Sequence, residues 1–300
     1  MDMTQNKCCR HGASLRRRRR RRRKILCFII FSCSIIAVAV FVAVGSSMIT
    51  SGDGRTNRYD VEAGNNTYDN AVIENSKISE KNKIQNNQSM LDDIMNSTQY
   101  PKQLKDLALK NEEALEFVYD YPAEHVKEHT IDLTEEASMD RVPLFVQWDK
   151  RWGYEKYSGN FFAASGCGPT TLSMVVVYLT HNRDASPIAV AKYSKEAGYS
   201  VDGSGSSWTL ISEGCRHYGV KAKTVALDES RMKAELDAGH PIVINVGPGD
   251  FTDTGHFMVI TGYDDEGFSI NDPNSIEKSG KRWLFRNISS QIRAVWSMYV

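Results

Sequence analysis

The chain has no overall excess of charge of either sign, and its basic residues are concentrated at one end. Of its 300 residues, 37 are Lys or Arg and 37 are Asp or Glu. Eleven of the basic residues but a single acidic residue lie within residues 1–24, so the remainder of the chain is net negative. Nucleic-acid binding needs a basic patch on the folded surface, and this charge balance provides none. We therefore expect no nucleic-acid partner for the globular part.

The chain also lacks an internal repeat and a nucleotide-binding loop. The glycine-rich segment GSGSSW at residues 203–208 is too short to surround a phosphate group, and it is not followed by Lys-Ser or Lys-Thr. Cysteines are few as well: six in the whole chain, of which only Cys167 and Cys215 lie beyond residue 44. With 41% hydrophobic and 10% aromatic residues, the chain is nevertheless long and apolar enough for one or two globular domains.

Charged residues are absent from residues 25–44, ILCFIIFSCSIIAVAVFVAV. A helix of this length, at about 1.5 Å per residue, spans the roughly 30 Å hydrocarbon layer of a membrane. The arginine run Arg16–Arg23 and then Lys24 precede it, and positive charge is retained on the cytoplasmic side. We predict a basic cytoplasmic tail at 1–24, a transmembrane helix at 25–44 that crosses the lipid bilayer once, and an extracellular remainder of the chain.

A cleavable signal peptide is the alternative interpretation of this apolar segment. The segment is longer than the usual apolar core of a signal peptide, and the AVGSS sequence at residues 43–47 is only a weak cleavage site. We therefore favour an uncleaved signal-anchor in the cell membrane.

The residues between the apolar segment and the globular domain show two different patterns. Residues 45–100 are rich in Asn, Ser, Asp, Gly and Lys and have no apolar periodicity, which predicts a flexible stem. Residues 101–139 begin with apolar residues at helical spacing, which predicts an amphipathic helix over 101–121 that ends at Pro122 and packs on the domain. The apolar positions of that helix are Leu104, Ala108, Leu115 and Val118.

Residues 140–300 have the pattern of one compact domain of ordinary size. In the first half we predict a buried helix over Cys167–Leu179, with Pro169 in its first turn, and further helices near 187–198 and 207–218. The second half contains short β-rich segments separated by Gly, Pro, Asn and Asp, which predict antiparallel strands. These segments are VKAKTVAL, PIVINVG, HFMVITGY, GFSIND, RWLFRNI and AVWSMYV. Helices followed by strands without β-α-β alternation predict an α+β fold of two lobes.

Cys167 lies at the predicted start of the apolar helix, in the sequence SGCGPTTLSMVVVYL. The free backbone N–H groups and the dipole at the N-terminus of a helix stabilise a thiolate. The flanking residues Gly166 and Gly168 leave room for a substrate backbone. This combination predicts a nucleophilic cysteine.

A nucleophilic cysteine requires an imidazole that forms an ion pair with the thiolate and later protonates the leaving amine. Among the seven histidines, His256 opens the predicted strand HFMVITGY directly after the glycine-containing loop GPGDFTDTG. A strand end beside such a loop would face a cleft, so we predict His256 as the catalytic base.

Two neighbouring residues are candidates for the group that orients this histidine. The strand turns at DDEG and returns as GFSINDP, and a three-residue loop centred near Asp264 would place Asp272 opposite His256 on one face of the sheet. A loop centred one or two residues later would displace this pairing. We predict Asp272 as the orienting residue and keep Asn271 as the alternative.

Acyl transfer also requires hydrogen-bond donors for the oxyanion. The backbone N–H of Cys167 would supply one donor. The side-chain amide of Gln147, in the upstream sequence VQWDKRWG, is the candidate for the second.

Taken together, these motifs resemble those of papain-like cysteine peptidases of the bacteriocin-processing type, in particular the stand-alone membrane-anchored bacterial members. The likeness rests on QWDKRWG, SGCGPTTLSMVVVYLT, GPGDFTDTGHFMVITGYD and NDPNS, within residues 100–300. It implies a papain-like fold, a peptide or protein substrate, no cofactor, and an oxyanion-hole role for Gln147. The chain lacks the multi-span transporter and the ATP-binding motif of the bacteriocin exporters, so leader-peptide processing does not follow from the likeness alone, and a double-glycine-type peptide stays one candidate substrate among others. The expected activity is thiol-dependent hydrolysis of peptide bonds outside the membrane.

Other interpretations of the same residues stay open at this point. A disulfide between Cys167 and Cys215 would suit an exported domain but would remove the nucleophile. His125, Glu128 and His129 form an H-x-x-E-H pattern, which in zinc peptidases lies on one helix. Here it falls in a short polar connection, so we expect no metal site. The fold could also serve as a non-catalytic extracellular binding module, or the same triad could catalyse amidase or transpeptidase chemistry.

Overall fold

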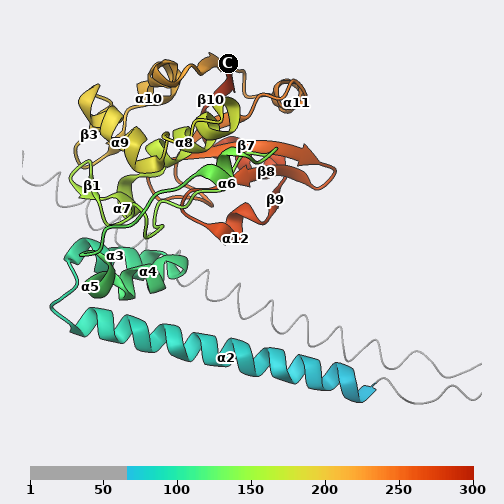
Figure 1. Cartoon of the computed structure of the whole chain (residues 1–300). Helices are drawn as coiled ribbons and strands as arrows, with labels where there is room; N and C mark the ends of the chain where they lie inside the picture. The colour runs from blue at the N-terminus through green and yellow to red at the C-terminus, as the bar shows by residue number, and fades with distance from the viewer. Residues whose placement is uncertain (1–65) are drawn as a thin grey trace, which may run out of the picture. The chain divides into compact units, whose positions relative to one another are not determined.

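The computed structural model describes residues 66–300, with side chains from residue 79 onward. Contacts link residues 68–300 into one unit (Figure 1). The predicted cytoplasmic tail at 1–24, the predicted transmembrane helix at 25–44 and the first part of the predicted stem lie outside the described residues. Over the described part of the chain, no helix combines the length and the apolar character needed to cross a membrane.

A long helix, α2 (Asn66–Asn96), takes the place of much of the predicted stem (Figure 1). Its sequence is mostly polar, but it contains no Gly or Pro and many residues of high helix propensity, such as Glu, Lys, Gln and Met. At its C-terminal end Ile94 is fully buried, and Lys105 Nζ donates hydrogen bonds to two backbone carbonyl oxygens. The prediction of a flexible stem over 45–100 is therefore wrong for 66–96, because helix propensity and the docking of one end outweigh the missing apolar face.

The predicted helix over 101–121 is broken into shorter pieces. The first piece, α3 (Lys102–Lys110), ends at Asn111, whose backbone is extended (φ −135°) and whose side chain accepts a hydrogen bond from the N–H of Glu113. Pro122 lies in the first turn of a later helix rather than ending one. The four apolar positions named in the sequence are nevertheless all buried in one cluster. The pieces that follow α3 are η1 (Glu112–Ala114), α4 (Leu115–Tyr119), α5 (Tyr121–Glu124) and α6 (Thr134–Ala137).

The buried helix of the domain is confirmed as α8 (Cys167–Thr180), with Pro169 in its first turn. Residues 168–177 are all buried, which explains why the sequence is apolar around the whole helix. His181 ends α8 in the left-handed conformation (φ 55°). The other predicted helical regions become α9 (Pro187–Glu196), α10 (Thr209–Ser212) and the 3-10 helix η2 (Gly214–Tyr218). The short elements around them are α7 (Phe162–Ser165) and the ribbons β1 (Lys156–Tyr157) with β2 (Asn160–Phe161) and β3 (Ser200–Val201) with β4 (Gly205–Ser206).

The second half of the domain folds into a six-stranded antiparallel sheet with the order β5-β10-β6-β7-β8-β9. The prediction of antiparallel strands is confirmed for five of the six β-rich segments; RWLFRNI forms only the two-residue strand β9 before the chain turns into α13. The strands are β5 (Lys221–Thr224), β6 (Ile242–Val246), β7 (His256–Asp264), β8 (Gly267–Asn271), β9 (Arg282–Trp283) and β10 (Ile292–Tyr299). The helices between them are α11 (Glu229–Asp237), α12 (Ile276–Ser279), α13 (Phe285–Ile288) and η3 (Ser289–Gln291).

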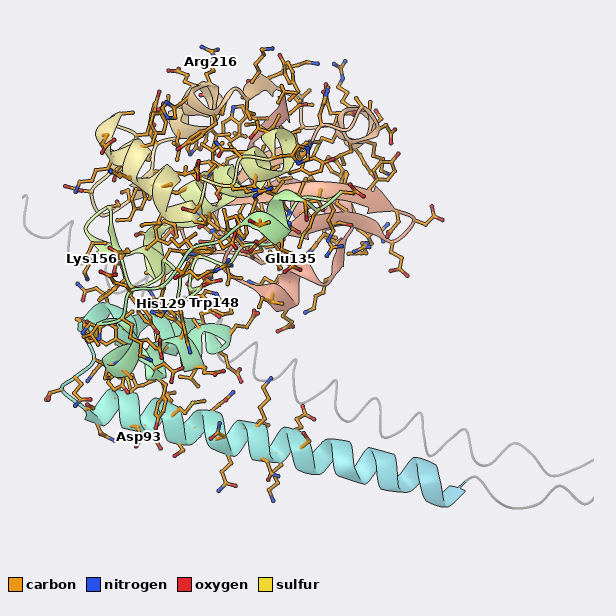
Figure 2. All side chains as sticks on the ribbon, in the orientation of Figure 1. Asp93, His129, Glu135, Trp148, Lys156 and Arg216 are labelled. Atoms are coloured by element: carbon orange, nitrogen blue, oxygen red, sulfur yellow. The ribbon has the colours of Figure 1, made fainter. Side chains whose placement is uncertain are left out.

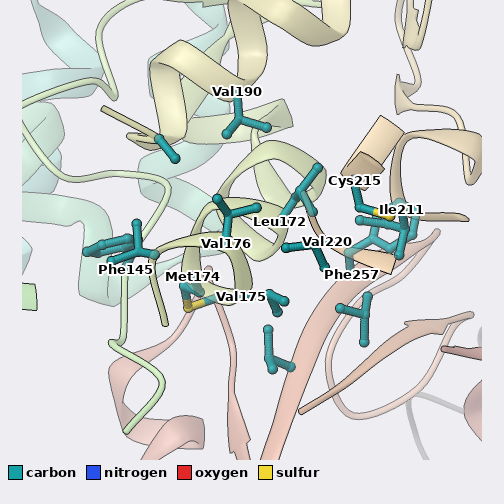
Figure 3. Close-up of a cluster of buried hydrophobic side chains, with 14 of the residues drawn as sticks. Phe145, Leu172, Met174, Val175, Val176, Val190, Ile211, Cys215, Val220 and Phe257 are labelled. Atoms are coloured by element: carbon teal, nitrogen blue, oxygen red, sulfur yellow. The ribbon is translucent and has the colours of Figure 1, made fainter. Parts of the chain in front are cut away.

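The main core lies between α8 and one face of this sheet (Figure 3). Leu172, Val175 and Val176 of α8 are fully buried in the same cluster as Phe257 and Val259 of β7. A second cluster fills the opposite face of the sheet. The fold therefore mixes helices with an antiparallel sheet, as predicted, and the packing of α8 on β7 sets the position of the first residue of each element.

Candidate active site

Cys167 is the first residue of α8 and is half-buried. A Cβ on Gly166 would lie 2.6 Å from the Phe162 ring, and one on Gly168 would lie 2.5 Å from Ser206 Oγ. Both glycines are therefore required for close packing around the cysteine, whereas the sequence suggested only access for a substrate. Pro169 has no N–H, and the N–H of Thr170 donates to the carbonyl oxygen of Gly166 (3.0 Å), so the donors that the start of α8 can offer at the cysteine are the N–H groups of Cys167 and Gly168.

His256 is the first residue of β7 and pairs across the sheet with Val246, the last residue of β6. It is only 6% exposed, and its imidazole lies near enough to the Cys167 thiol to lower the pKa of that thiol. On the other side of the ring, Nε2 lies 2.6 Å from Oδ1 of Asp272. Since Nε2 is engaged by the carboxylate, Nδ1 is the nitrogen left for the thiol. The structure thus brings the three predicted residues together at one end of the groove-forming elements α8 and β7.

Asp272 reaches His256 by a different route from the predicted one. The β7–β8 loop has two residues, because Asp264 pairs with Gly267, and the register shifts between Ile260 and Gly262. As a result Val259 pairs with Asn271, and Asp272 follows the end of β8 rather than lying opposite His256. The predicted three-residue loop centred near Asp264 is therefore wrong, although the two side chains still meet. A bulge and a turn, rather than direct pairing, bring the carboxylate to the ring.

The carboxylate of Asp272 is fully buried and held by the turn that follows it. Its Oδ1 accepts a hydrogen bond from the N–H of Asn274 (2.8 Å) as well as facing His256. Its own N–H donates to Ser279 Oγ (2.9 Å). An Asp side chain that accepts from the N–H two residues later forms an Asx-turn, a pattern that the sequence D-P-N-S would have allowed us to expect.

Asn271, the alternative orienting residue, faces away from His256. Its Nδ2 donates to the carbonyl oxygens of Val142 (3.2 Å) and Pro143 (3.0 Å). Because successive side chains of an extended backbone point in opposite directions, the side chains of the neighbouring residues 271 and 272 contact different parts of the domain. The structure brings Asp272 to His256, and Asn271 instead joins the end of β8 to the entry segment of the domain.

The surroundings of Cys167 and His256 shift the pKa values of both groups. Burial opposes ionisation of Cys167, but the hydrogen bond and charge of His256, together with the backbone N–H groups of Phe257 and Gly168, lower its pKa below the usual range. Burial also opposes protonation of His256, yet the charge and hydrogen bond of Asp272 and the neighbouring thiol raise the pKa of the imidazole to about 10. Both directions favour a thiolate–imidazolium pair at neutral pH, a state suited to nucleophilic attack followed by proton donation.

Gln147, the predicted oxyanion donor, lies beside the cysteine. It is 4% exposed, and its Nε2 donates to the carbonyl oxygen of Ala163 (2.7 Å), four residues before Cys167 in the chain. A side-chain amide has two N–H bonds, so this contact leaves one donor. Within the described part of the chain, Oε1 of Gln147 is buried without a hydrogen-bond partner.

A groove of about 630 Å³ runs past these residues. Cys167, His256 and Gln147 all line it, so the three residues border the same cavity. The loop 249–255, which connects β6 to β7, contributes a continuous stretch of the lining. Residues of α3 contribute as well: Gln103, Asp106, Leu107 and Lys110. The involvement of α3 was not predicted, because no local pattern indicates where a surface helix docks.

The loop 249–255 is itself held by a residue that the sequence analysis did not identify. Gln291 accepts a hydrogen bond from the N–H of Asp250 (2.7 Å) and donates one to its carboxylate (2.6 Å). A Cβ on Gly249 would lie 2.0 Å from Gln291 Oε1, so only glycine allows this approach. The two residues of this contact are 41 positions apart, and no short motif links them.

The two cysteines of the domain and the H-x-x-E-H residues were the subject of other interpretations, a disulfide and a metal site. Cys167 and Cys215 are both free thiols, and Cys215 is fully buried in the main core, where burial raises its pKa to about 11. His125 Nδ1 lies 2.6 Å from the carbonyl oxygen of Tyr121, and the His129 ring contacts the carbonyl oxygen of Glu124. The H-x-x-E-H residues thus follow the short helix α5 instead of sharing one long helix.

Comparison with known proteins gives a family for the domain. The model of the Peptidase_C39 like family matches residues 139–300. One similar solved structure is the peptidase domain of Streptococcus ComA, a bifunctional ABC transporter involved in quorum sensing, with 18% identity, a TM-score of 0.39, and coverage of 53% of this chain and 96% of that one. Another is a C39-like peptidase from Bacillus anthracis, with 18% identity, a TM-score of 0.33, and coverage of 53% and 95%.

A comparison with curated proteins found no match. The family match covers more than half of the chain and contains Cys167, His256 and Asp272. Members of a peptidase family act on peptide or protein substrates. The chain therefore belongs to the Peptidase_C39-like family and is a cysteine peptidase of the bacteriocin-processing type.

Proposed function

We propose that the protein hydrolyses peptide bonds with Cys167 as nucleophile, His256 as acid and base, Asp272 as the orienting carboxylate and Gln147 as an oxyanion donor, in a papain-like two-lobed arrangement. The observation that carries this proposal is the buried 2.6 Å contact between His256 Nε2 and Asp272 Oδ1, with the Cys167 thiol near the same ring and lining the same groove. This arrangement fixes the ring orientation and supports its charged form.

In the proposed first step, the Cys167 thiolate attacks the carbonyl carbon of the substrate. The carbonyl π electrons move onto oxygen, where the N–H of Cys167 and the remaining N–H of Gln147 Nε2 would stabilise the negative charge. The imidazolium of His256 then donates its proton to the leaving nitrogen as the carbon–nitrogen bond breaks. The products of this step are a free amine and a thioester on Cys167.

In the second step, water attacks the thioester while neutral His256 accepts one of its protons. The tetrahedral intermediate collapses, the carbon–sulfur bond breaks, and the carboxylic acid leaves. The thiolate–imidazolium pair is restored without any cofactor. Because Asp272 is fully buried, its charge acts on the imidazole with little screening by solvent.

The test is the variant Cys167→Ser, assayed with a peptide library and mass spectrometric identification of the cleaved bonds. We expect no cleavage by Cys167→Ser and near-normal cleavage by the matched variant Cys215→Ala, which removes the other thiol of the domain. Undiminished cleavage by Cys167→Ser would reject the assignment. The same product analysis separates hydrolysis from amide or acyl transfer to an amine, since transfer yields a new amide bond instead of a free carboxylate. If the wild-type protein neither cleaves a peptide nor transfers an acyl group in this assay, a non-catalytic binding module is favoured.

We further propose that the peptidase acts outside the cell membrane, with one transmembrane helix at 25–44. The support is the uncharged sequence of that segment and the arginine run before it. Intact cells treated with a membrane-impermeant maleimide should label Cys167 but not Cys8 or Cys9, which precede the predicted span. Labelling of Cys8 and Cys9 without labelling of Cys167 would reverse the proposed orientation.

A further inference from the structure

The turn that carries Asp272 is held by a residue from the segment that precedes the family-matched region. Glu113 of η1 accepts a hydrogen bond from the hydroxyl of Ser275 and two more from the backbone N–H groups of Ile276 (2.7 Å) and Glu277 (3.1 Å). These two N–H groups belong to the first turn of α12, where backbone donors have no partner within a helix. The Glu113 carboxylate, which lies outside the family-matched region, therefore stabilises the turn after Asp272 through three hydrogen bonds.

A second residue of the same segment contacts the middle of the turn. Asn111 Nδ2 donates to the backbone oxygen of Asn274 (2.9 Å) and to its side-chain oxygen (3.1 Å). The N–H of Asn274 in turn donates to Oδ1 of Asp272, the oxygen that faces His256. A continuous series of contacts thus leads from Asn111 through Asn274 to the histidine.

The turn is also held from within the domain, by the oxyanion candidate Gln147 and by the residue that follows it. The N–H of Gln147 donates to the carbonyl oxygen of Pro273 (2.7 Å), and Trp148 Nε1 donates to that of Asn274 (3.2 Å). Figure 2 shows Trp148 where the helices before residue 125 meet the domain. The backbone oxygen of Asn274 therefore accepts one hydrogen bond from the domain and one from Asn111, so neither side alone fixes the turn.

The preceding segment is itself docked firmly enough to transmit this restraint. The Tyr154 hydroxyl donates to the carbonyl oxygen of Phe117 (2.8 Å), and the two rings stack with centroids 4.2 Å apart. Lys150 Nζ lies 2.6 Å from the carboxylate of Asp120. Leu104 of α3 is fully buried. These contacts place η1 at a defined position on the domain.

We propose that Glu113 and Asn111 are positioning residues of the active site. The segment Lys102–Ala114 then contributes to catalysis by holding the turn that carries Asp272, and it is not only a stem. The inference rests on the proposed function. If the Glu113 carboxylate is removed, the turn loses three hydrogen bonds and Asp272 no longer holds the imidazole in one orientation. The thiolate of Cys167 then loses its partner, and its pKa rises toward the ordinary cysteine value of about 8.5.

The test measures the pH dependence of Cys167 alkylation in the full-length chain. Iodoacetamide labelling is followed by mass spectrometry of the peptide containing Cys167, so the other cysteines do not interfere. For Glu113→Ala we expect the midpoint of the alkylation rate plotted against pH to rise by about one pH unit. We also expect kcat on a cleavable peptide to fall by about 10- to 100-fold at nearly unchanged KM, since small misplacements of catalytic groups have effects of this size.

Three further variants separate positioning from general destabilisation. Glu113→Gln should stay close to wild type, because its amide oxygen can accept the two backbone N–H groups and its NH₂ group can donate to Ser275. Glu113→Asp, whose carboxylate is one CH₂ group farther from the turn, should shift the midpoint in the same direction as Glu113→Ala but less. Glu116→Ala, an exposed glutamate of α4 in the same region, is the matched control and should leave both readouts unchanged.

A wild-type alkylation profile and wild-type kcat in Glu113→Ala would overturn the proposal, as would an equal shift in Glu116→Ala. If Glu113→Ala does not fold, as judged by circular dichroism, a wild-type profile in Glu113→Asp overturns it instead. Alkylation requires no substrate, so the two proposals can fail separately. A shifted profile in an enzyme that cleaves no peptide rejects hydrolysis alone, and an unchanged profile in an enzyme that needs Cys167 for cleavage rejects the positioning role alone.

Discussion

The buried contact between Asp272 and His256 leads to a prediction about the pH range of activity. Asp272→Asn keeps the shape of the side chain and its Oδ1 acceptor but removes the charge. The new NH₂ group would replace Oδ2, which is buried without a hydrogen-bond partner among the described residues, so no existing contact is lost. We therefore expect the variant to fold and its imidazole to stay oriented, while the imidazolium loses most of its stabilisation.

The size of the effect follows from the pKa of His256, which is raised from 6.5 to about 10 although burial lowers it. The charge of Asp272 is the largest of the influences that raise this pKa, so we expect the substitution to lower it by roughly three pH units, which corresponds to about 4 kcal/mol of stabilisation of the imidazolium. The proton donor is lost above the pKa of His256, and the nucleophile is lost below the pKa of Cys167. In the pH profile of kcat/KM, the alkaline limb should therefore move down toward neutral pH, and the acid limb should move up in pH.

The assay is kcat/KM for one peptide between about pH 5 and pH 10. Asp272→Asn should lose roughly 100-fold near pH 7 and more near pH 9, where the wild-type imidazole is still protonated. Asp272→Ala, which also loses the orienting acceptor, should lose up to about 10⁴-fold. Asp264→Asn, at the exposed last residue of β7, serves as the matched control. An Asp272→Asn enzyme whose two limbs coincide with those of the wild type would refute this account of the pair.

Two further substitutions test the oxyanion donor and the core. Gln147→Ala should lower kcat by about 100- to 1,000-fold with little change in KM, because the amide would act on charge that develops only in the transition state; a change confined to KM would contradict that role. Leu172→Ala, at a fully buried position of α8, should lower the free energy of unfolding by about 2–5 kcal/mol as measured by denaturant titration. Leu109→Ala, which truncates an exposed leucine, should cost far less, and equal losses for the two variants would contradict the packing argument.

Much of the domain could be predicted because its signals are local. The helix α8 is recognisable from its apolar run, its first-turn proline and its length, and each of the six predicted strand segments supplies a strand of the sheet, although RWLFRNI supplies only the two residues of β9. Cys167 and His256 could be selected because nucleophilic chemistry restricts both the residue type and the kind of backbone position. The helix α2 was missed because its stability depends on propensity and on the docking of one end, neither of which gives an apolar period.

The sequence alone therefore determined which residues have suitable chemistry and which elements carry them. The tertiary structure alone decided which of them meet. A register shift between β7 and β8 and a turn after Asn271 direct Asp272, and not its neighbour, toward His256. The docking of α3 and η1 brings Glu113 to a turn 162 positions later in the chain. Such contacts depend on how separate elements pack, and packing is set by the whole core rather than by any short segment.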